Sequence, residues 1–170
     1  LNQAREAYDR ALTLSRDARD QRMEAICLRE LGNLELMGGE LDAARTTYEA
    51  SLSLNRAGGH ELERLATENS LGELARKGGE LDVARERFKS SLAIAMAREL
   101  HGDAGVALGN LGLTELAAGD YFAAHEAMDR LDELLADQPR HWLTPYRLTI
   151  RVAAAAGAEE AAGEVLAADV

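Results

Sequence analysis

The chain has 170 residues, of which 46% are hydrophobic and only 4% are aromatic, and its formal net charge is −11 at pH 7. This length and apolar content suffice for the core of one ordinary domain. The acidic balance argues against nucleic-acid binding, and no apolar run approaches the roughly 20 residues of a membrane span. A single cysteine excludes an internal disulfide and fits a reducing compartment, so we expect a cytoplasmic protein.

The first predicted element is a helix over residues 1–17. Its apolar positions recur at helical spacing as Leu1, Ala4, Tyr8, Ala11 and Leu12. The same pattern returns forty residues later as Leu41, Ala44, Tyr48, Ser51 and Leu52. We therefore interpret residues 1–17 as a half-repeat, the second helix of a pair. Neither end carries a polar capping helix, so we expect a fragment of a longer protein that can self-associate through its uncapped ends.

Three full repeats follow, over residues 20–57, 61–99 and 103–137, and each is predicted to be a pair of helices. The stretch LGNLELMGGELDAAR at 31–45 returns as LGELARKGGELDVAR at 71–85, and a looser copy, LGLTELAAGDYFAAH, begins at Leu111. A fixed spacing of this length indicates stacked supersecondary units. Gly39, Gly79 and Gly119 are predicted to end the first helix of each pair in the left-handed conformation. The segments RAGGHELER (56–64) and LHGDAG (100–105) are predicted to separate the repeats.

A degenerate fourth repeat is predicted over residues 143–168, which would make residues 1–170 a single repeat array. Thr144 and Pro145 are typical of an N-cap followed by proline at the first helical position. The repeat pattern continues with Tyr146, Ile150, Gly157, Ala162 and Leu166. Gly157 takes the place of the turn glycines in this alignment, so a second helix is expected after it.

These features together resemble the tetratricopeptide repeat (TPR) family: Leu-Gly in the first helix, a glycine-acid turn, then Ala-x-x-x-(Tyr/Phe) in the second helix. The resemblance implies an all-α, right-handed superhelical solenoid of antiparallel helix pairs. It also implies close helix crossings at Gly32, Gly72 and Gly112, near Ala44, Ala84 and Ala124. The units are about six residues longer than the usual repeat of roughly 34, which requires longer helices or longer connectors. The aromatic residue expected early in the first helix is Leu28, Glu68 or Leu108 here.

Catalytic or metal chemistry finds little support in the sequence. The four histidines are scattered, and none pairs with another at metal-ligand spacing. Cys27 lies on the apolar side of a predicted helix, where a buried and inert thiol is expected. We therefore predict that the chain is not an enzyme and uses no cofactor and no metal.

A binding surface is better supported, because the first helices of TPR-like repeats line a concave groove. The resemblance places in this groove the residues three before, one after and five after the crossing position of each first helix. The predicted partner-binding residues are Arg29, Asn33, Met37, Asn69, Glu73, Lys77, Leu113, Arg147 and Arg151. Four of them are cations, which is unusual in so acidic a chain and predicts an acidic peptide as the partner.

Three functions remain open from the sequence. The favoured one is a protein-interaction scaffold that binds a peptide, or a segment of another domain of its parent chain, in the groove. The second is a ligand-sensing or regulatory segment of a bacterial transcriptional or signalling regulator, since repeats of this length resemble those of large bacterial signalling regulators and adaptor scaffolds. The third is a self-association module. None of the three involves nucleic acid or a membrane.

Overall fold

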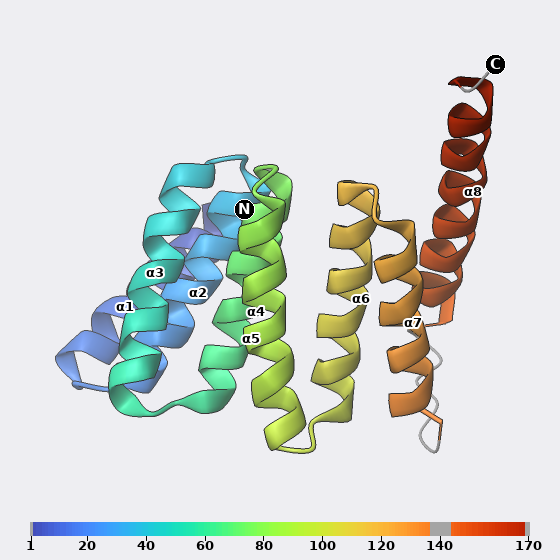
Figure 1. Cartoon of the computed structure of the whole chain (residues 1–170). Coiled ribbons are helices and arrows are strands. Elements are labelled where there is room, and N and C mark those ends of the chain that lie inside the picture. Colours follow the sequence, from blue (N-terminus) through green and yellow to red (C-terminus); the bar gives the residue numbers. More distant parts are fainter. Residues whose placement is uncertain (1, 137–143, 169–170) are drawn as a thin grey trace. The chain divides into compact units, whose positions relative to one another are not determined.

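The computed structural model describes residues 2–136 and 144–168, and within these ranges it is entirely α-helical, with eight helices and no strand. The helices are α1 (Asn2–Asp17), α2 (Gln21–Met37), α3 (Leu41–Gly58), α4 (Glu61–Lys77), α5 (Leu81–Ala97), α6 (His101–Ala118), α7 (Tyr121–Leu134) and α8 (Thr144–Ala168). They form two compact units, Leu1–Ile94 and Ala95–Val170, and successive helices within each unit run antiparallel (Figure 1). The prediction of an all-α chain is confirmed.

One turn geometry joins the first seven helices, and it recurs every 20 residues. A residue with positive φ stands at each turn, namely Arg19, Gly39, Gly59, Gly79, Glu99 and Gly119. The residue after it donates its amide to a carbonyl five residues back, as from Glu40 to Glu35 and from Glu80 to Ala75, both at 2.9 Å. This hydrogen bond is typical of the Schellman motif that ends helices. The left-handed conformation predicted for Gly39, Gly79 and Gly119 is confirmed.

The turns also settle where the additional residues of each repeat lie. Connectors such as residues 38–40 and 78–80 are short, whereas α2 has 17 residues and α3 has 18. The extra length is therefore in the helices. The segment LHGDAG at 100–105 was expected to separate repeats, and this expectation is wrong from His101 onward, because α6 begins there. The residue with positive φ at this turn is Glu99, which directly precedes the predicted segment and adopts φ = 56°.

Replacing Gly79 with alanine should lower the free energy of unfolding by about 1 kcal/mol, because a side chain at φ = 78° is strained even though nothing lies within 4 Å of the added Cβ. Glu99→Gly is the complementary change, since it relieves the same strain at an equivalent turn. It should cost nothing or stabilise slightly. Chemical denaturation followed by circular dichroism measures both, and equal destabilisation by the two variants would contradict this interpretation of the turns.

At the predicted helix crossings, each glycine lies close to a large side chain of a neighbouring helix. A Cβ on Gly32 would lie 2.6 Å from the ring of Tyr48, and one on Gly72 would lie 2.6 Å from the ring of Phe88. At the third crossing, the glycine faces Met128 and Ile150. The alanines at these crossings, Ala44, Ala84 and Ala124, are fully buried. Each glycine therefore makes room for the large side chain one turn beyond the alanine.

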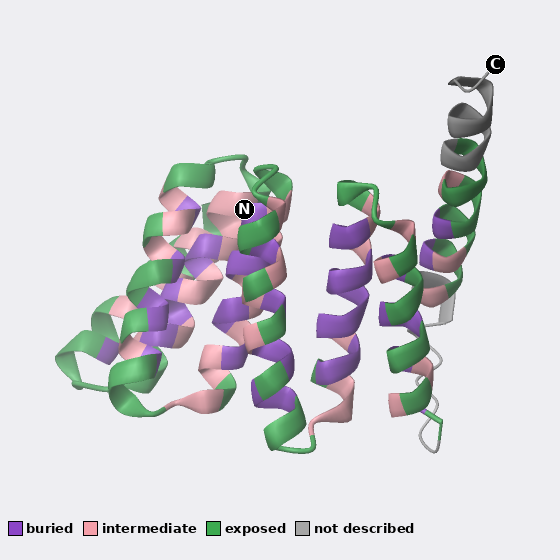
Figure 2. Cartoon of the chain, in the orientation of Figure 1, coloured by how far each residue is buried: buried purple, intermediate pink, exposed green. Residues whose placement is uncertain are grey.

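The core of the first unit surrounds these contacts. It includes Ala44, Tyr48, Leu52, Leu71 and Leu74, with Leu36 packed against them. Figure 2 shows such buried residues as stripes along the helices of this unit, separated by exposed faces. Helix α1 packs against α2 with the half-buried residues Ala4, Tyr8, Ala11 and Leu12, as its apolar stripe predicts. Leu14 is the large apolar side chain that α1 exposes, and self-association through this end stays a prediction.

Helix α8 packs against α6 and α7 in the second unit, with Ile150 and Ala154 buried. It continues without a break from Thr144 to Ala168, so the turn expected at Gly157 is absent from this helix. The physical reason is the alanine-rich sequence on both sides of Gly157, since alanine has the highest helix propensity and one glycine costs only about 1 kcal/mol. Residues 137–143, at the predicted boundary between the third and fourth repeats, lie outside the described part of the chain, as do the side chains of Tyr146, Ala162 and Leu166.

Candidate functional site

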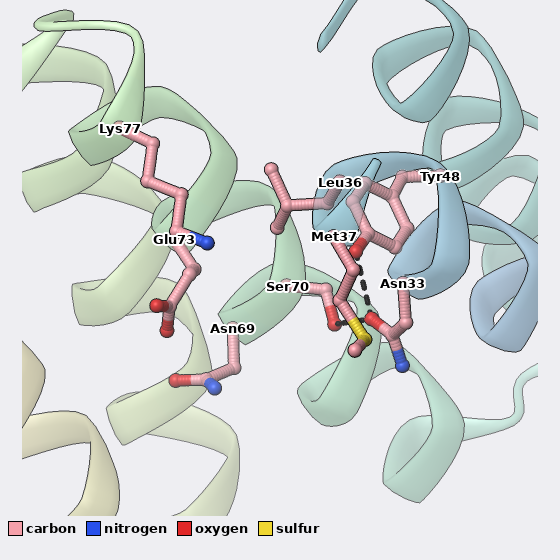
Figure 3. Close-up of a pocket in the computed structure, with 8 residues that line it drawn as sticks. All are labelled: Asn33, Leu36, Met37, Tyr48, Asn69, Ser70, Glu73 and Lys77. Atoms are coloured by element: carbon pink, nitrogen blue, oxygen red, sulfur yellow. Dashed lines mark hydrogen bonds between the residues drawn. The ribbon is translucent and has the colours of Figure 1, made fainter. Parts of the chain in front are cut away.

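A pocket of about 330 Å³ lies in the first unit, between α2, α3 and α4 (Figure 3). Its walls are formed by Asn33, Leu36 and Met37 of α2, Tyr48 of α3, and Asn69, Ser70, Glu73 and Lys77 of α4. Five of these were predicted as partner-binding residues: Asn33, Met37, Asn69, Glu73 and Lys77. Residues spaced four apart lie along one face of a helix, and α2 and α4 contact each other, so the two predicted stripes come together here.

The other three lining residues were not predicted as binding residues. Leu36 and Tyr48 stand at apolar positions of the helical pattern, which is typical of core residues. The pattern does not indicate that part of each side chain also lines a cavity. Ser70 directly follows a predicted binding residue, and it lies on the side of α4 that faces α2. Tyr48 is fully buried and forms the floor of the pocket, whereas Met37 is 69% exposed at its rim.

A hydrogen-bonded network surrounds the Asn33 amide. The Tyr48 hydroxyl donates to Asn33 Oδ1 at 2.7 Å, and the Ser70 hydroxyl donates to the same oxygen at 3.4 Å (Figure 3). Asn33 Nδ2 donates to Glu30 Oε2 at 3.1 Å, and the other oxygen of Glu30 pairs with Arg29 at 2.6 Å. Burial raises the pKa of Tyr48 to about 12, so its hydroxyl keeps its proton at any pH near neutrality.

The two charged residues that line the pocket differ in whether their charge is paired. Glu73 pairs with Arg76 at 3.2 Å, one turn further along α4. Lys77 is exposed, and within the part of the chain that the structure describes its ammonium group makes no ion pair. The pocket therefore combines one positive charge open to a ligand with amide and hydroxyl groups and the apolar side chains of Leu36 and Met37.

The remaining predicted binding residues do not line this pocket. Arg29 is on α2 but is engaged by Glu30. Leu113, Arg147 and Arg151 belong to the second unit, where all three are half-buried.

The two arginines of α8 bind carboxylates of their own chain. Arg147 pairs with Asp132 of α7, and Arg151 binds both Asp129 and Asp132 at 2.7 Å. The hydrogen bond from Arg151 lowers the pKa of Asp129 below its ordinary value. Arg147 and Arg151 were predicted to bind an acidic partner. The structure instead gives them a role in joining α7 to α8, because acidic residues of α7 lie within reach of both guanidinium groups.

Other chemistry-bearing residues are not assembled into a site in the described ranges. No group of three His, Cys, Asp or Glu side chains could hold a metal ion within the residues that are described. Cys27 is buried, and this burial, together with the nearby Asp20 and Glu24, raises the pKa of its thiol. Across the same residues, the structure contains no helix that is both long and apolar enough for a membrane span.

Comparison with solved structures identifies the architecture. The structure of BtubC (BKLC) from P. vanneervenii matches with a TM-score of 0.67 and 23% sequence identity, over 81% of this chain and 59% of that one. The structure of nearly identical TPR-like repeats from a Podosopora anserina protein described as a kinesin light chain matches with a TM-score of 0.73 and 17% identity, over 99% of this chain and 82% of that one. The chain has a TPR-like repeat fold. No family model matches the sequence, and no curated relative does.

The TPR-like fold gives the pocket a place within the repeat. Helices α2 and α4 are the first helices of two successive repeats, and they supply seven of the eight lining residues. The chain spans 59% of the length of BtubC, so it corresponds to part of that protein. At these sequence identities the likeness concerns the fold alone.

Proposed function

We propose that this chain is a protein-interaction module that binds a short segment of a partner protein, or of another domain of its parent chain, in the pocket between α2 and α4. The observation that carries the proposal is the convergence of Asn33, Met37, Asn69, Glu73 and Lys77 on one pocket. The TPR-like fold supports a scaffold over an enzyme, because such folds present helix faces to other proteins. The pocket also offers hydrogen-bonding amides and apolar contacts, which suit a peptide.

The favoured ligand is an acidic segment. The Lys77 ammonium is open to a carboxylate, whereas the nearby negative charge of Glu73 is already paired with Arg76. An apolar side chain next to that carboxylate would contact Met37 and Leu36 at the other wall of the pocket (Figure 3). Because the chain as a whole is acidic, a positive charge at the pocket that is unpaired among the described residues helps to direct an acidic segment to this position.

A second candidate is the binding of a small molecule by a sensor segment. A volume of about 330 Å³ is within the range of small-molecule sites, at its lower end. The pocket is also open at the exposed side chains of Met37 and Lys77, which suits a peptide passing through it better than an enclosed ligand. The two functions are separated by whether peptides selected from a library bind the chain.

Lys77→Ala should weaken the binding of an acidic peptide about two- to five-fold, because one exposed ion pair contributes up to about 1 kcal/mol. The probes are peptides selected on the intact chain from a displayed library of short random sequences, with Asp and Glu replaced by Asn and Gln in matched neutral versions. Titration calorimetry at two salt concentrations measures the affinities, and the difference between acidic and neutral peptides should shrink at high salt.

Lys89→Ala is the matched control, because Lys89 is also an exposed lysine but does not line the pocket. It lies on α5, where it pairs with Glu86. The Lys89→Ala variant should bind the selected peptides like the wild type. Equal losses in the Lys77 and Lys89 variants would place the binding outside the pocket and overturn the proposal. A library that yields no binding peptide would favour the small-molecule function.

A further inference from the structure

The Asn33 side chain can present only one kind of polar group to a ligand. Glu30 is a carboxylate and can only accept hydrogen bonds, so the amide group that faces it at 3.1 Å has to be Nδ2. Oδ1 then faces the other way, where it accepts hydrogen bonds from both Tyr48 and Ser70. An amide oxygen has two lone pairs, and both are used.

One Nδ2 hydrogen of Asn33 is donated to Glu30, and the second Nδ2 hydrogen is the hydrogen-bonding group of the amide that is still unused. The described residues provide no acceptor for that hydrogen. Tyr48 is fully buried, so a ligand has no access to its oxygen. Asn33 and Lys77 therefore offer donors to whatever occupies the pocket. A freely rotating asparagine amide, in contrast, would accept or donate equally well.

The neighbouring repeat lacks this network, although its backbone packing is the same. Phe88 occupies the position of Tyr48 and packs against Gly72 as Tyr48 packs against Gly32, because a Cβ added to either glycine would lie 2.6 Å from the facing ring. The ring alone is thus sufficient to fill the helix crossing. The hydroxyl of Tyr48 adds the hydrogen bond to Asn33, and the residue at the position of Asn33 in the next repeat is Glu73.

We propose that Tyr48 is a positioning residue of the pocket: with Glu30 and Ser70, it fixes the Asn33 amide so that only an N–H remains available to a ligand, and this N–H selects a carbonyl or carboxylate oxygen. The inference rests on the proposed function and deepens it, because it names the ligand group that Asn33 recognises. A segment that offers a backbone carbonyl to Asn33 and an acidic side chain to Lys77 would satisfy both donors.

The test is Tyr48→Phe, which keeps the ring in the helix crossing and removes the hydroxyl. With peptides selected on the wild-type chain as probes, we expect affinity to fall about five- to ten-fold, the effect of one well-placed hydrogen bond. Tyr8→Phe is the matched control, since Tyr8 stands at the same repeat position on α1, outside the pocket, and should leave affinity unchanged.

A ligand-free measurement accompanies the binding data. The side-chain amide of Asn33 should give two ¹H resonances on one ¹⁵N, and the hydrogen bonded to Glu30 should exchange slowly in the wild type. Its exchange should accelerate in Tyr48→Phe but not in Tyr8→Phe. Suppose that Tyr48→Phe binds a peptide as tightly as the wild type does, while Lys77→Ala binds the same peptide more weakly. This result would overturn the inference and leave the proposed function standing. If no peptide binds at all, the proposed function fails. In that case the hydrogen-exchange measurement alone tests whether Tyr48 fixes the Asn33 amide, and an exchange rate unchanged in Tyr48→Phe would show that it does not.

Discussion

Replacing Gly72 with alanine is expected to lower the free energy of unfolding by about 3 kcal/mol, the upper part of the range for overpacked cores. The added Cβ would lie 2.6 Å from Phe88 Cε1, a separation that real Cβ atoms essentially never show. Phe88 is fully buried, so its ring cannot turn aside without displacing its neighbours in a close-packed interior. Urea denaturation followed by circular dichroism at 222 nm (the helical signal) measures the loss.

Gly78→Ala is the matched control, because it makes the same chemical change six residues later at the end of the same helix. Its φ of −78° is ordinary for alanine, and its added Cβ would have no neighbour closer than 3.5 Å. We expect a change within about 0.5 kcal/mol. Phe88→Leu should restore part of the stability lost in Gly72→Ala, since it shortens the side chain that the new methyl group meets. A Gly72→Ala variant as stable as Gly78→Ala would show that the helix crossing is not close-packed.

The helices and most turns could be predicted from the sequence because they depend on local chemistry. Gly39, Gly79 and Gly119 are recognisable because glycine adopts positive φ without steric cost. Arg19 and Glu99 carry no such signal. They adopt φ of 56° because the amide of the next residue bonds back to the helix, which outweighs a local strain of about 1–2 kcal/mol.

The pocket could be predicted only in part, for a similar reason. Helical spacing determines which residues share a face, so Asn33 with Met37 and Glu73 with Lys77 follow directly from the sequence. The partners across helices depend on tertiary packing. The hydrogen bond from Tyr48 to Asn33 joins residues 15 apart. The same limitation explains the arginines of α8, whose carboxylate partners on α7 lie 15 to 22 positions earlier in the chain.

Glu68 is the residue at which this chain departs most from an apolar repeat core, and its removal should be the other large effect on stability. Its side chain is only 2% exposed, and its two oxygens accept hydrogen bonds from Arg56 of α3 and Arg87 of α5, each at 3.0 Å. The carboxylate therefore ties α4 to the helices on either side of it. Glu68→Ala should lower the free energy of unfolding by about 3 kcal/mol, chiefly because it leaves a cavity where a buried side chain stood.

Glu68→Leu separates the cavity from the charge. The equivalent residues of the other two full repeats are Leu28 and Leu108, both buried, so leucine is known to fit this repeat position. Arg56 is 57% exposed and Arg87 is 29% exposed, and both can turn toward water once the carboxylate is gone. Because leucine fills the space of the carboxylate and both arginines can be solvated, no charge is left buried without a partner, and we expect Glu68→Leu to cost about 1 kcal/mol or less. Denaturation at low and high salt measures both variants. If leucine proves as destabilising as alanine, the two ion pairs themselves hold the three helices together, and the strength of that tie can then be read from double-mutant cycles with Arg56→Gln and Arg87→Gln.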